Sequence, residues 1–538
     1  MNLQFMGAAR EVTGSRYLLQ TLGKSILIDC GMEQGGDTYE NQELPVAANL
    51  VDCVVLTHAH IDHSGMLPEL FQRGFRGPIY ATPATYALCD IMLRDSAHIQ
   101  EQEAEWSNRK AERSGVPAYV PLYTLADAEG TLTLFQKVSY GVPAQILDHV
   151  RLTLIDAGHL LGSTSASLEV AEGGVSKTIV FSGDIGNIGQ PILDDPHYLT
   201  KADYVVMEST YGDRQHGPRP DYVADLVDVL QTTFDRGGNV VIPSFAVGRT
   251  QEILYFLREI KEKHLVRGHE GFPVYLDSPL AIKATEIFVN SAENNFDAEM
   301  RRMIGAGINP ISFADLRLTE SADESKAINF ETRPCVIISA SGMAEAGRIR
   351  HHLKHNLWKE NATILFVGYQ SVGTMGRLLV DGAKEVRLFQ ESIAVHAQIR
   401  MLKAISGHAD RDGLLVWAES FSPTPARFFV CHGEEEVAMS FAKQLEATGK
   451  KTAVPFNGDG WDLLADKQSE SGRRVLADKK AKKKAKAKEI LQVAGGQNLQ
   501  GSFDRLGSLI DTSKGFSTDL KQQLAEQIDK LVRKWEQG

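Results

Sequence analysis

The segment Thr57-His58-Ala59-His60-Ile61-Asp62-His63 places three imidazoles and a carboxylate within six positions. It follows an apolar run, residues 51–56, that predicts a buried strand, and residues 64–70 predict a turn that leads into a helix. The ligand-type side chains are therefore expected in a loop at the C-terminal end of a strand, where open α/β sheets place their chemistry. Zinc accepts neutral imidazole nitrogen and carboxylate oxygen in catalytic sites. A polar turn whose histidines cap or pair locally is the alternative, but the density of ligands favours a metal site.

The length and composition indicate a multidomain globular protein. The chain has 538 residues, which is too long for one ordinary core, so two or three domains are expected. Hydrophobic residues make up 43% and charged residues 23%, as in soluble proteins. No apolar stretch is long enough to cross a bilayer, and the N-terminus lacks the pattern of a secretory signal. We therefore expect a cytoplasmic protein without a membrane partner.

Cysteine usage and net charge further narrow the classes of protein to which the chain could belong. The five cysteines form no C-x-x-C pair, so buried free thiols are expected in a reducing compartment, rather than disulfides or a thiolate zinc site. The net charge of −12 argues against a generally basic protein that coats nucleic acid. It leaves room for a local phosphate-binding groove, because a bound metal adds positive charge that the sequence does not contain.

The chain alternates strand-like runs with helical patterns, which predicts an α/β layer architecture. From about Gly212 a second set of α/β units begins, and it ends near Gly376, where a strand-rich return follows. Residues 479–488 hold seven lysines and are interpreted as a solvated helix or linker. Beyond them an amphipathic helix is expected, a candidate interface for a homo-oligomer, with its apolar face at Leu520, Leu524, Ile528, Leu531 and Trp535.

Three later residues share the layout of the first loop. His159, Asp184 and His432 each come just after an apolar strand and have a glycine beside them, which lets backbone and metal approach closely. Each residue taken alone is better interpreted as a hydrogen-bonded strand end. The recurrence of the layout favours a shared metal site, because a two-metal centre needs another histidine and a bridging carboxylate.

These residues, in this order, resemble the metallo-β-lactamase superfamily, and in particular its β-CASP nucleases, over residues 1 to about 465. Within that group the chain resembles prokaryotic ribonucleases related to the endonuclease subunit of the messenger-RNA cleavage and polyadenylation factor. None of the seven motifs departs from the family pattern. They are Asp29, the His58/His60/Asp62/His63 loop, His159, Asp184, Glu208 in Glu208-Ser209-Thr210, His408 in Ser406-Gly407-His408, and His432 in Cys431-His432-Gly433.

The resemblance implies two zinc ions per chain, with manganese as an alternative for nitrogen and oxygen ligands. It implies that one ion is held by three histidines, the other by two histidines and an aspartate, and that a second aspartate bridges both. A hydroxide between the ions would attack the phosphorus in line. The implied ligands are His58, His60 and His159 for the first ion, Asp62, His63 and His432 for the second, and Asp184 for both.

The resemblance also implies roles for three further residues. Asp29 would accept the second N–H of a ligand imidazole and so fix the ring. His408 would contact the scissile phosphate and protonate the leaving oxygen, because imidazole titrates near neutral pH. Glu208 would orient His408. The predicted catalytic set is Asp29, Asp62, Asp184, Glu208 and His408.

The fold that the resemblance implies is an αββα sandwich with an inserted α/β β-CASP domain. The expected divisions are residues 1–211 for the first part of the sandwich, 212–376 for the insertion, 377–465 for the return with its RNA-metabolising segment, and 466–538 for the Lys-rich linker and the helical tail.

Two strand–turn–helix segments are candidates for substrate contacts. Residues 243–250 could hold a phosphate on backbone N–H groups, with Arg249 adding a bidentate contact. Residues 339–348 have a similar layout and contribute Ser341, Gly342 and Arg348. An ordinary capped helix is the alternative for each segment. Together with His408, these four residues form the predicted substrate-binding set.

The resulting interpretation is a zinc-dependent ribonuclease that hydrolyses phosphodiester bonds of single-stranded RNA in RNA processing or degradation. It would act as an endonuclease, with 5′-to-3′ exonuclease action as a further activity that fold alone does not decide. The alternatives are a DNA nuclease of the same clan, a small-molecule hydrolase of the superfamily, and a non-catalytic RNA-binding scaffold. His432 favours RNA over DNA, because the DNA-acting branch usually lacks it, and the complete ligand set argues against a scaffold.

Overall fold

The computed structural model describes residues 1–34, 43–111, 119–291, 295–371, 373–402 and 406–472. The lysine run at 479–488 and the apolar helix face at 520–535 lie outside the described residues. The chain forms two compact units, one of Met1–His98 with Tyr123–Leu476 and the other of Ile99–Leu122 with Ala477–Gly538.

The first sheet of the larger unit has eight strands in the order β23-β22-β1-β2-β3-β4-β5-β6. Strands β1 to β3 are antiparallel, whereas β3 to β6 run parallel, so β3, β4 and β5 end at the same edge. The strands are β1 (Asn2–Gly7), β2 (Arg16–Thr21), β3 (Lys24–Ile28), β4 (Cys53–Val55), β5 (Ile79–Ala81), β6 (Phe135–Lys137), β22 (Gly460–Asp462) and β23 (Lys467–Glu470).

The second sheet has seven strands in the order β21-β20-β11-β10-β9-β8-β7. Strand β20 pairs in parallel with β11 although more than two hundred positions separate them in sequence. The chain therefore leaves this sheet at the end of β11 and returns beside it. The strands are β7 (Ala144–Leu147), β8 (Val150–Asp156), β9 (Thr164–Glu172), β10 (Val175–Phe181), β11 (Tyr204–Met207), β20 (Arg427–Val430) and β21 (Thr452–Ala453).

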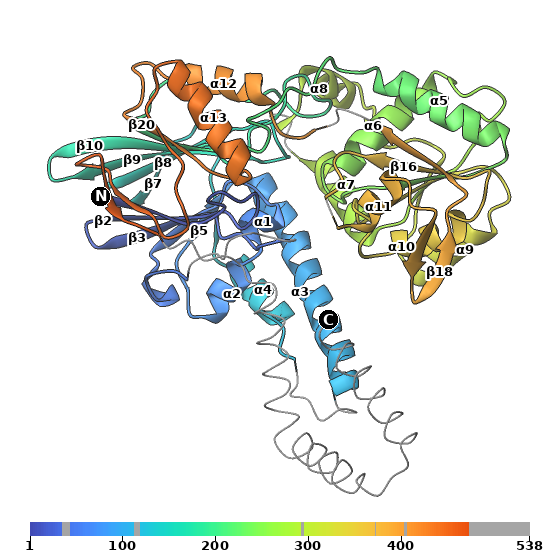
Figure 1. The fold of residues 1–538 in the computed structure, drawn as a ribbon, viewed down its shortest axis with the longest axis horizontal. Helices are drawn as coiled ribbons and strands as arrows, with labels where there is room; N and C mark the ends of the chain where they lie inside the picture. The colour runs from blue at the N-terminus through green and yellow to red at the C-terminus, as the bar shows by residue number, and fades with distance from the viewer. Residues whose placement is uncertain (35–42, 112–118, 292–294, 372, 403–405, 473–538) are drawn as a thin grey trace, which may run out of the picture. The chain divides into compact units, whose positions relative to one another are not determined.

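The two sheets pack face to face over one apolar core, as Figure 1 shows. Alternate residues of most strands supply it, for example Phe5 from the first sheet against Phe429 from the second, with ring centroids 5.0 Å apart. Helices cover both outer faces, which gives the predicted αββα sandwich. These helices are α1 (Ile61–Ser64), α2 (Leu67–Gln72), α3 (Pro83–Ala111) and α4 (Leu125–Leu132) on the first sheet, and α12 (Arg411–Glu419) and α13 (Glu435–Ala447) on the second.

The inserted domain is a six-stranded parallel sheet in the order β14-β13-β15-β12-β16-β19, with helices around it. Its four central strands are buried apolar runs, as expected for a parallel sheet covered on both faces, whereas the edge strands β14 and β19 are largely exposed. The strands are β12 (Val240–Pro243), β13 (Val274–Leu276), β14 (Leu316–Leu318), β15 (Val336–Ser339), β16 (Thr363–Val367) and β19 (Gln398–Leu402). The helices are α5 (Tyr222–Asp235), α6 (Arg249–Glu262), α7 (Pro279–Asn290), α8 (Ala298–Gly305), α9 (Ala322–Ala327), α10 (Ile349–Asn356) and α11 (Met375–Val380).

The inserted sheet continues beyond residue 376, the expected end of the insertion. Strand β19 pairs in parallel with β16, from Thr363 with Gln398 to Val367 with Leu402, so it belongs to the inserted sheet. The hairpin of β17 (Glu385–Leu388) and β18 (Glu391–Ala394) precedes it. Alternating apolar residues predict a strand here, but they do not specify which of two sheets receives it.

Three smaller findings complete the fold. All five cysteines are free and buried, as predicted. In the second unit, the side chain of Asn108 near the end of α3 hydrogen-bonds to both backbone groups of Tyr119. In the part of the chain that the structure describes, no helix combines the length and the apolar character needed to cross a membrane.

Candidate metal centre

The loop after β4 holds the first four predicted ligands. His58 follows the strand and is fully buried, and His60 directly precedes the short helix α1. That helix turns Asp62 and His63 toward the same space, with His63 buried. The local order strand, loop and helix is the one that the sequence predicts.

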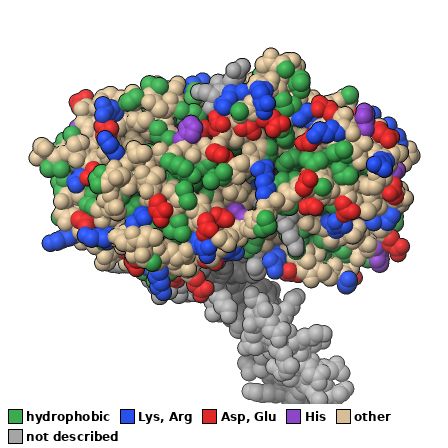
Figure 2. Space-filling view, turned by 90° about the horizontal axis from the view of Figure 1, so that it is seen from above, with side chains coloured by type: hydrophobic (Ala, Val, Ile, Leu, Met, Phe, Trp, Pro, Cys, Tyr) green, Lys and Arg blue, Asp and Glu red, His purple; other side chains and the backbone are tan. Residues whose placement is uncertain are grey.

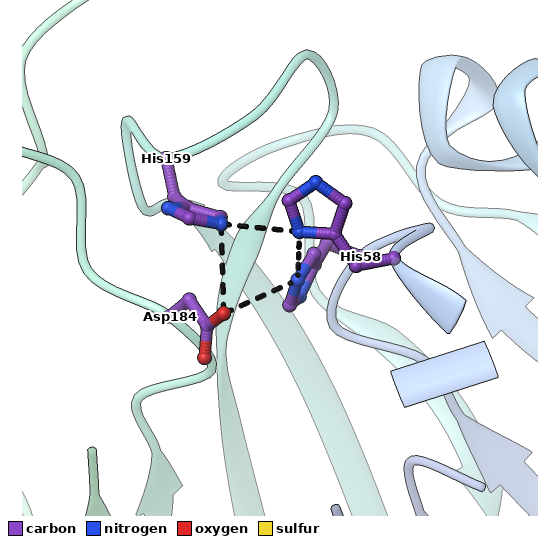
Figure 3. A group of neighbouring side chains, drawn as sticks. His58, His159 and Asp184 are labelled. Carbon is purple, nitrogen blue, oxygen red and sulfur yellow. Dashed lines mark hydrogen bonds and ion pairs between the residues drawn. The ribbon is translucent and has the colours of Figure 1, made fainter. Parts of the chain in front are cut away.

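Four ligand-type atoms meet in a first group, made by His58, His60, His159 and Asp184. The His60 Nδ1 atom lies 3.1 Å from His58 Nε2 and 3.2 Å from His159 Nε2. Asp184 Oδ2 lies 3.4 Å from His58 Nε2 and 3.5 Å from His159 Nε2. Figure 3 shows the side chains of His58, His159 and Asp184 pointing toward one another from separate loops.

Asp62, His63 and His432 make a second group beside the first. The Nε2 atoms of the two histidines are 3.1 Å apart, and His432 Nε2 is 3.7 Å from Asp62 Oδ2. The other carboxylate oxygen of Asp184, Oδ1, lies 3.3 Å from His63 Nε2 and 3.6 Å from His432 Nε2. One carboxylate therefore faces both groups with one oxygen each.

These distances fit metal coordination better than hydrogen bonding. Nitrogen and oxygen ligands about 2.0–2.1 Å from a tetrahedral zinc ion would be about 3.3–3.4 Å from each other, close to the spacings in both groups. Asp184 Oδ1 is a buried oxygen without a hydrogen-bond partner. Buried polar atoms nearly always have a partner, so this oxygen is suited to a cation. The residues fit two metal ions that share Asp184.

Asp29 and Thr57 hold part of the first loop in place. Asp29 accepts hydrogen bonds from the Thr57 N–H (2.8 Å), from the Thr57 hydroxyl (2.9 Å) and from His63 Nδ1–H (2.8 Å). The Thr57 hydroxyl in turn accepts from His58 Nδ1–H at 3.1 Å. Both imidazoles therefore present Nε2 to the centre, which is the tautomer that a metal requires.

Two more candidate ligand rings, those of His432 and His159, are fixed by groups that were not predicted from the sequence. The Thr210 hydroxyl accepts from His432 Nδ1–H at 3.1 Å, and the Gly407 carbonyl accepts from His159 Nδ1–H at 3.0 Å. Thr57, Thr210 and Gly407 all lie within two positions of a motif residue. A hydroxyl or a glycine beside a ligand is the only sequence signal that could have indicated them.

Glu208 and His408 form a pair next to the first group. His408 Nδ1–H lies 3.1 and 3.2 Å from the two oxygens of Glu208, and 3.9 Å from Asp184 Oδ2. Glu208 also accepts the N–H groups of Ile185 and Thr210 at 2.6 and 3.3 Å. These bonds occupy the Glu208 carboxylate and suit it to orient His408 rather than to bind a metal.

The charges of the site follow from burial and from Asp184. Burial lowers the pKa of His58 and His159, so both rings stay neutral and offer a lone pair. Burial opposes charge on His63 and His432 too, yet the neighbouring Asp184 carboxylate raises the pKa of both. Burial likewise opposes charge on His408, but Glu208 and Asp184 raise its pKa to about 9, so it is protonated at neutral pH.

The backbone turns sharply where the ligands leave their strands. Asp29 and His432 have positive φ values of 57° and 46°, which side-chain-bearing residues rarely adopt. Gly183, with φ of 57°, precedes Asp184, and a Cβ atom there would lie 2.6 Å from the Thr164 carbonyl oxygen. The strand ends are thus folded tightly around the centre, and only glycine fits at position 183.

The predicted substrate-binding residues of the insertion have polar partners within the protein. Arg249 begins α6, and its guanidinium is paired with Glu252. The Arg348 guanidinium donates to buried Asp277 at 2.7 Å and to backbone carbonyls, so it anchors its own loop. The Ser341 hydroxyl accepts from the N–H groups of residues 345 and 346, and Gly342 lies next to it in the same loop.

A pocket of about 210 Å³ opens near His408 and is lined by side chains from both the sandwich and the insertion. Its basic members are Arg219, Arg249 and His216. His216 Nε2–H also donates to the His408 carbonyl at 3.1 Å. Glu252 and Asp410 line the same pocket, and Glu252 pairs with Arg249, so the charges of the two arginines are largely balanced there.

Comparison with protein families divides the chain into three consecutive matches. The metallo-beta-lactamase superfamily matches residues 10–244, the Beta-Casp domain matches 250–379, and a Zn-dependent metallo-hydrolase RNA specificity domain matches 392–455. The last match includes β19, which hydrogen bonding assigns to the inserted sheet.

Comparison with characterised proteins finds relatives over most of the chain. Ribonuclease TTHA0252 of Thermus thermophilus is 37% identical over 86% of this chain and 99% of its own length. Transcription termination factor FttA of Methanocaldococcus jannaschii is 33% identical over 85% of this chain and 71% of its own length. A relative this similar over nearly its whole length establishes common family membership.

Proposed function

Because the chain belongs to the metallo-β-lactamase superfamily and to its β-CASP branch, we propose that it is a two-zinc ribonuclease. One observation supports the proposal more strongly than the others. Asp184 faces both ligand groups, with one carboxylate oxygen 3.4–3.5 Å from two histidines of the first and the other 3.3–3.6 Å from two histidines of the second. A shared carboxylate between two open-sided histidine groups is the arrangement of a two-metal hydrolase.

The chain's own residues can carry the remaining chemistry. Two divalent ions held by the two groups would supply an activated water and neutralise charge on the phosphoryl oxygens. His408, whose pKa the neighbouring Glu208 carboxylate raises, can give a proton to the leaving oxygen. Glu208 holds the His408 ring and stabilises its charged form. Asp29 and Thr57 keep His58 and His63 in the metal-binding tautomer.

The finer points of the proposal concern metal, substrate and compartment. We assign zinc, with manganese as the alternative, because the donors are imidazoles and carboxylates in groups of three and four. The substrate is single-stranded RNA, cut internally. Five free, buried cysteines support a reducing compartment, the cytoplasm. The tail that could form a homo-oligomer interface lies outside the described residues.

The test is hydrolysis by the purified full chain, loaded with zinc, of single-stranded RNA, DNA of the same sequence and a chromogenic lactam. We expect cleavage of RNA and little or none of the other two. His60→Ala should reduce RNA cleavage below detection, because it removes one of three nitrogens of the first group.

His396→Ala is the matched control, since His396 is an exposed histidine far along the insertion. It should cleave RNA at the wild-type rate. Full activity of His60→Ala would refute the proposed site, whereas cleavage of DNA at the same rate as RNA would refute the substrate.

A further inference from the structure

The inserted sheet has a topological switch point between β12 and β15. These strands are parallel neighbours in the order β14-β13-β15-β12-β16-β19. From β12 the chain passes through α6 to β13 on one side, whereas from β15 it passes through α10 to β16 on the other. At such a point the loops after the two strands diverge and leave a crevice, where open α/β sheets bind ligands.

The loops after β12 and β15 touch each other at this switch point. The Ser244 N–H donates to the Ser339 carbonyl at 3.0 Å. A Cβ atom on Gly342 would lie 2.8 Å from the Phe245 ring and 3.1 Å from its backbone nitrogen. Only glycine leaves room for that ring, yet Phe245 remains 47% exposed. The contact thus holds an aromatic ring at the surface rather than in the core.

The loop after β16 brings a second exposed aromatic residue to the same glycine. Gln370 is buried, and its side-chain amide donates to the Gly342 carbonyl at 3.2 Å and to the Tyr369 carbonyl at 3.1 Å. Tyr369 itself is 54% exposed. Phe245 and Tyr369 therefore rise from backbone that is fixed around Gly342. We call these two side chains the aromatic pair.

The loop that carries Phe245 also packs close to the candidate metal centre. A Cβ atom on Gly248, at the end of the loop that carries Phe245, would lie 3.2 Å from the Leu160 side chain. Leu160 is the neighbour of the ligand His159. Figure 2 shows hydrophobic side chains exposed in patches among acidic and basic ones on this molecule's surface.

We propose that Phe245 and Tyr369 are stacking surfaces for the bases of the RNA strand next to the scissile phosphate. The inference rests on the proposed function and names the part of the substrate that these residues recognise. Every base has a π face, so stacking on aromatic side chains binds single strands with little sequence preference. Phosphate contacts at this switch point are less suitable, because the Ser341 hydroxyl and the Arg348 guanidinium already have partners within the protein.

Steady-state kinetics on single-stranded RNA tests the inference with Phe245→Leu and Tyr369→Leu, which keep apolar bulk and remove the π face. We expect KM to rise about 5- to 150-fold for each, the range for losing one stacked base. The kcat should stay within about twofold, because stacking strengthens ground state and transition state alike.

A second substrate set separates stacking from a structural effect. The set consists of RNAs that each carry one abasic nucleotide, placed at successive positions along the strand. With the wild-type protein, KM should rise by a similar factor when the abasic nucleotide lies at one or two of these positions. On the RNA that lacks the base stacked by the substituted residue, each variant should lose nothing further. Loss of the same factor on ordinary and abasic RNA would overturn the inference.

Phe330→Leu and Trp358→Leu are the matched controls. These residues are 82% and 55% exposed, and they precede β15 and β16, at the opposite edge of the same sheet. Both controls should keep the wild-type KM, and all four variants should unfold at the wild-type temperature. A wild-type KM in the Phe245 and Tyr369 variants would overturn this inference and leave the proposed function standing. A wild-type chain that cuts no RNA would overturn the proposed function, and the inference with it.

Discussion

Asp156, at the end of β8 three positions before the candidate ligand His159, is a buried carboxyl group with no positive partner among the described residues. Burial raises its pKa to about 7, despite a hydrogen bond of 2.8 Å from the Gly158 N–H. Its ordinary pKa is about 4, so the folded chain binds an extra proton between about pH 4 and pH 7. The free energy of unfolding should therefore fall as pH rises through this window, by up to about 1.4 kcal/mol per unit.

Asp156→Asn should flatten that slope, because an amide keeps the acceptor for Gly158 and does not ionise. The measurement is the urea midpoint at several pH values in constant zinc. Asp148→Asn, which changes an exposed acid in the turn before β8, is the control and should keep the wild-type slope. Equal slopes in wild type and Asp156→Asn would show that the carboxyl group does not titrate in this window.

At the scale of the element, the insertion has a buried cluster of polar side chains at the end of one strand, β13. Asp277, just after β13, is fully buried and accepts hydrogen bonds from Thr319, Ser325, Arg348 and His352 at 2.5–2.7 Å. It joins the loop after β14, helix α9 and the start of α10. Arg348 therefore stabilises the fold of the insertion. A sequence pattern of strand, turn and arginine cannot distinguish this structural role from a phosphate contact.

Asp277→Ala should destabilise the insertion by about 3–5 kcal/mol, because it leaves the buried His352 and the partly buried Arg348 without their shared acceptor. The loss should appear as a lower unfolding temperature or as an earlier, separate transition of the insertion. Asp323→Ala is the control, since that carboxylate is 93% exposed. An unchanged unfolding profile for Asp277→Ala would mean that water or another group replaces the carboxylate at no cost.

The secondary-structure elements also show which parts of the fold and of the candidate site could be predicted from the sequence. Strand ends followed by histidine or aspartate could be found from local patterns, since the apolar runs before His58, Asp184 and His432 are continuous. Their convergence could be inferred from the family resemblance, not from spacing. The pairing of β19 with β16 and the roles of Thr210 and Gly407 could not be predicted, because they depend on contacts between segments far apart in sequence.

At the scale of the molecule, the candidate ligands tie together chain segments that the insertion separates. His58 to His63 follow β4 of the first sheet, whereas Asp184 and His432 follow β10 and β20 of the second. Strand β20 comes after the insertion, so the centre is complete only when the chain has returned to the sandwich. Metal bound there would join both sheets and should stabilise the sandwich wherever the folded state binds it and the unfolded state does not.

Removal of zinc with a chelator should therefore lower the unfolding temperature, and added zinc should restore it. Free zinc at about 100 times its Kd would contribute about 2.7 kcal/mol per site. Elemental analysis should find about two ions per wild-type chain and about one in His432→Ala, because this change removes a ligand of the second group only. His396→Ala should keep two. If His432→Ala also kept two ions and the wild-type unfolding temperature, His432 would not be a ligand, and the link between the returning strand and the metals would be lost.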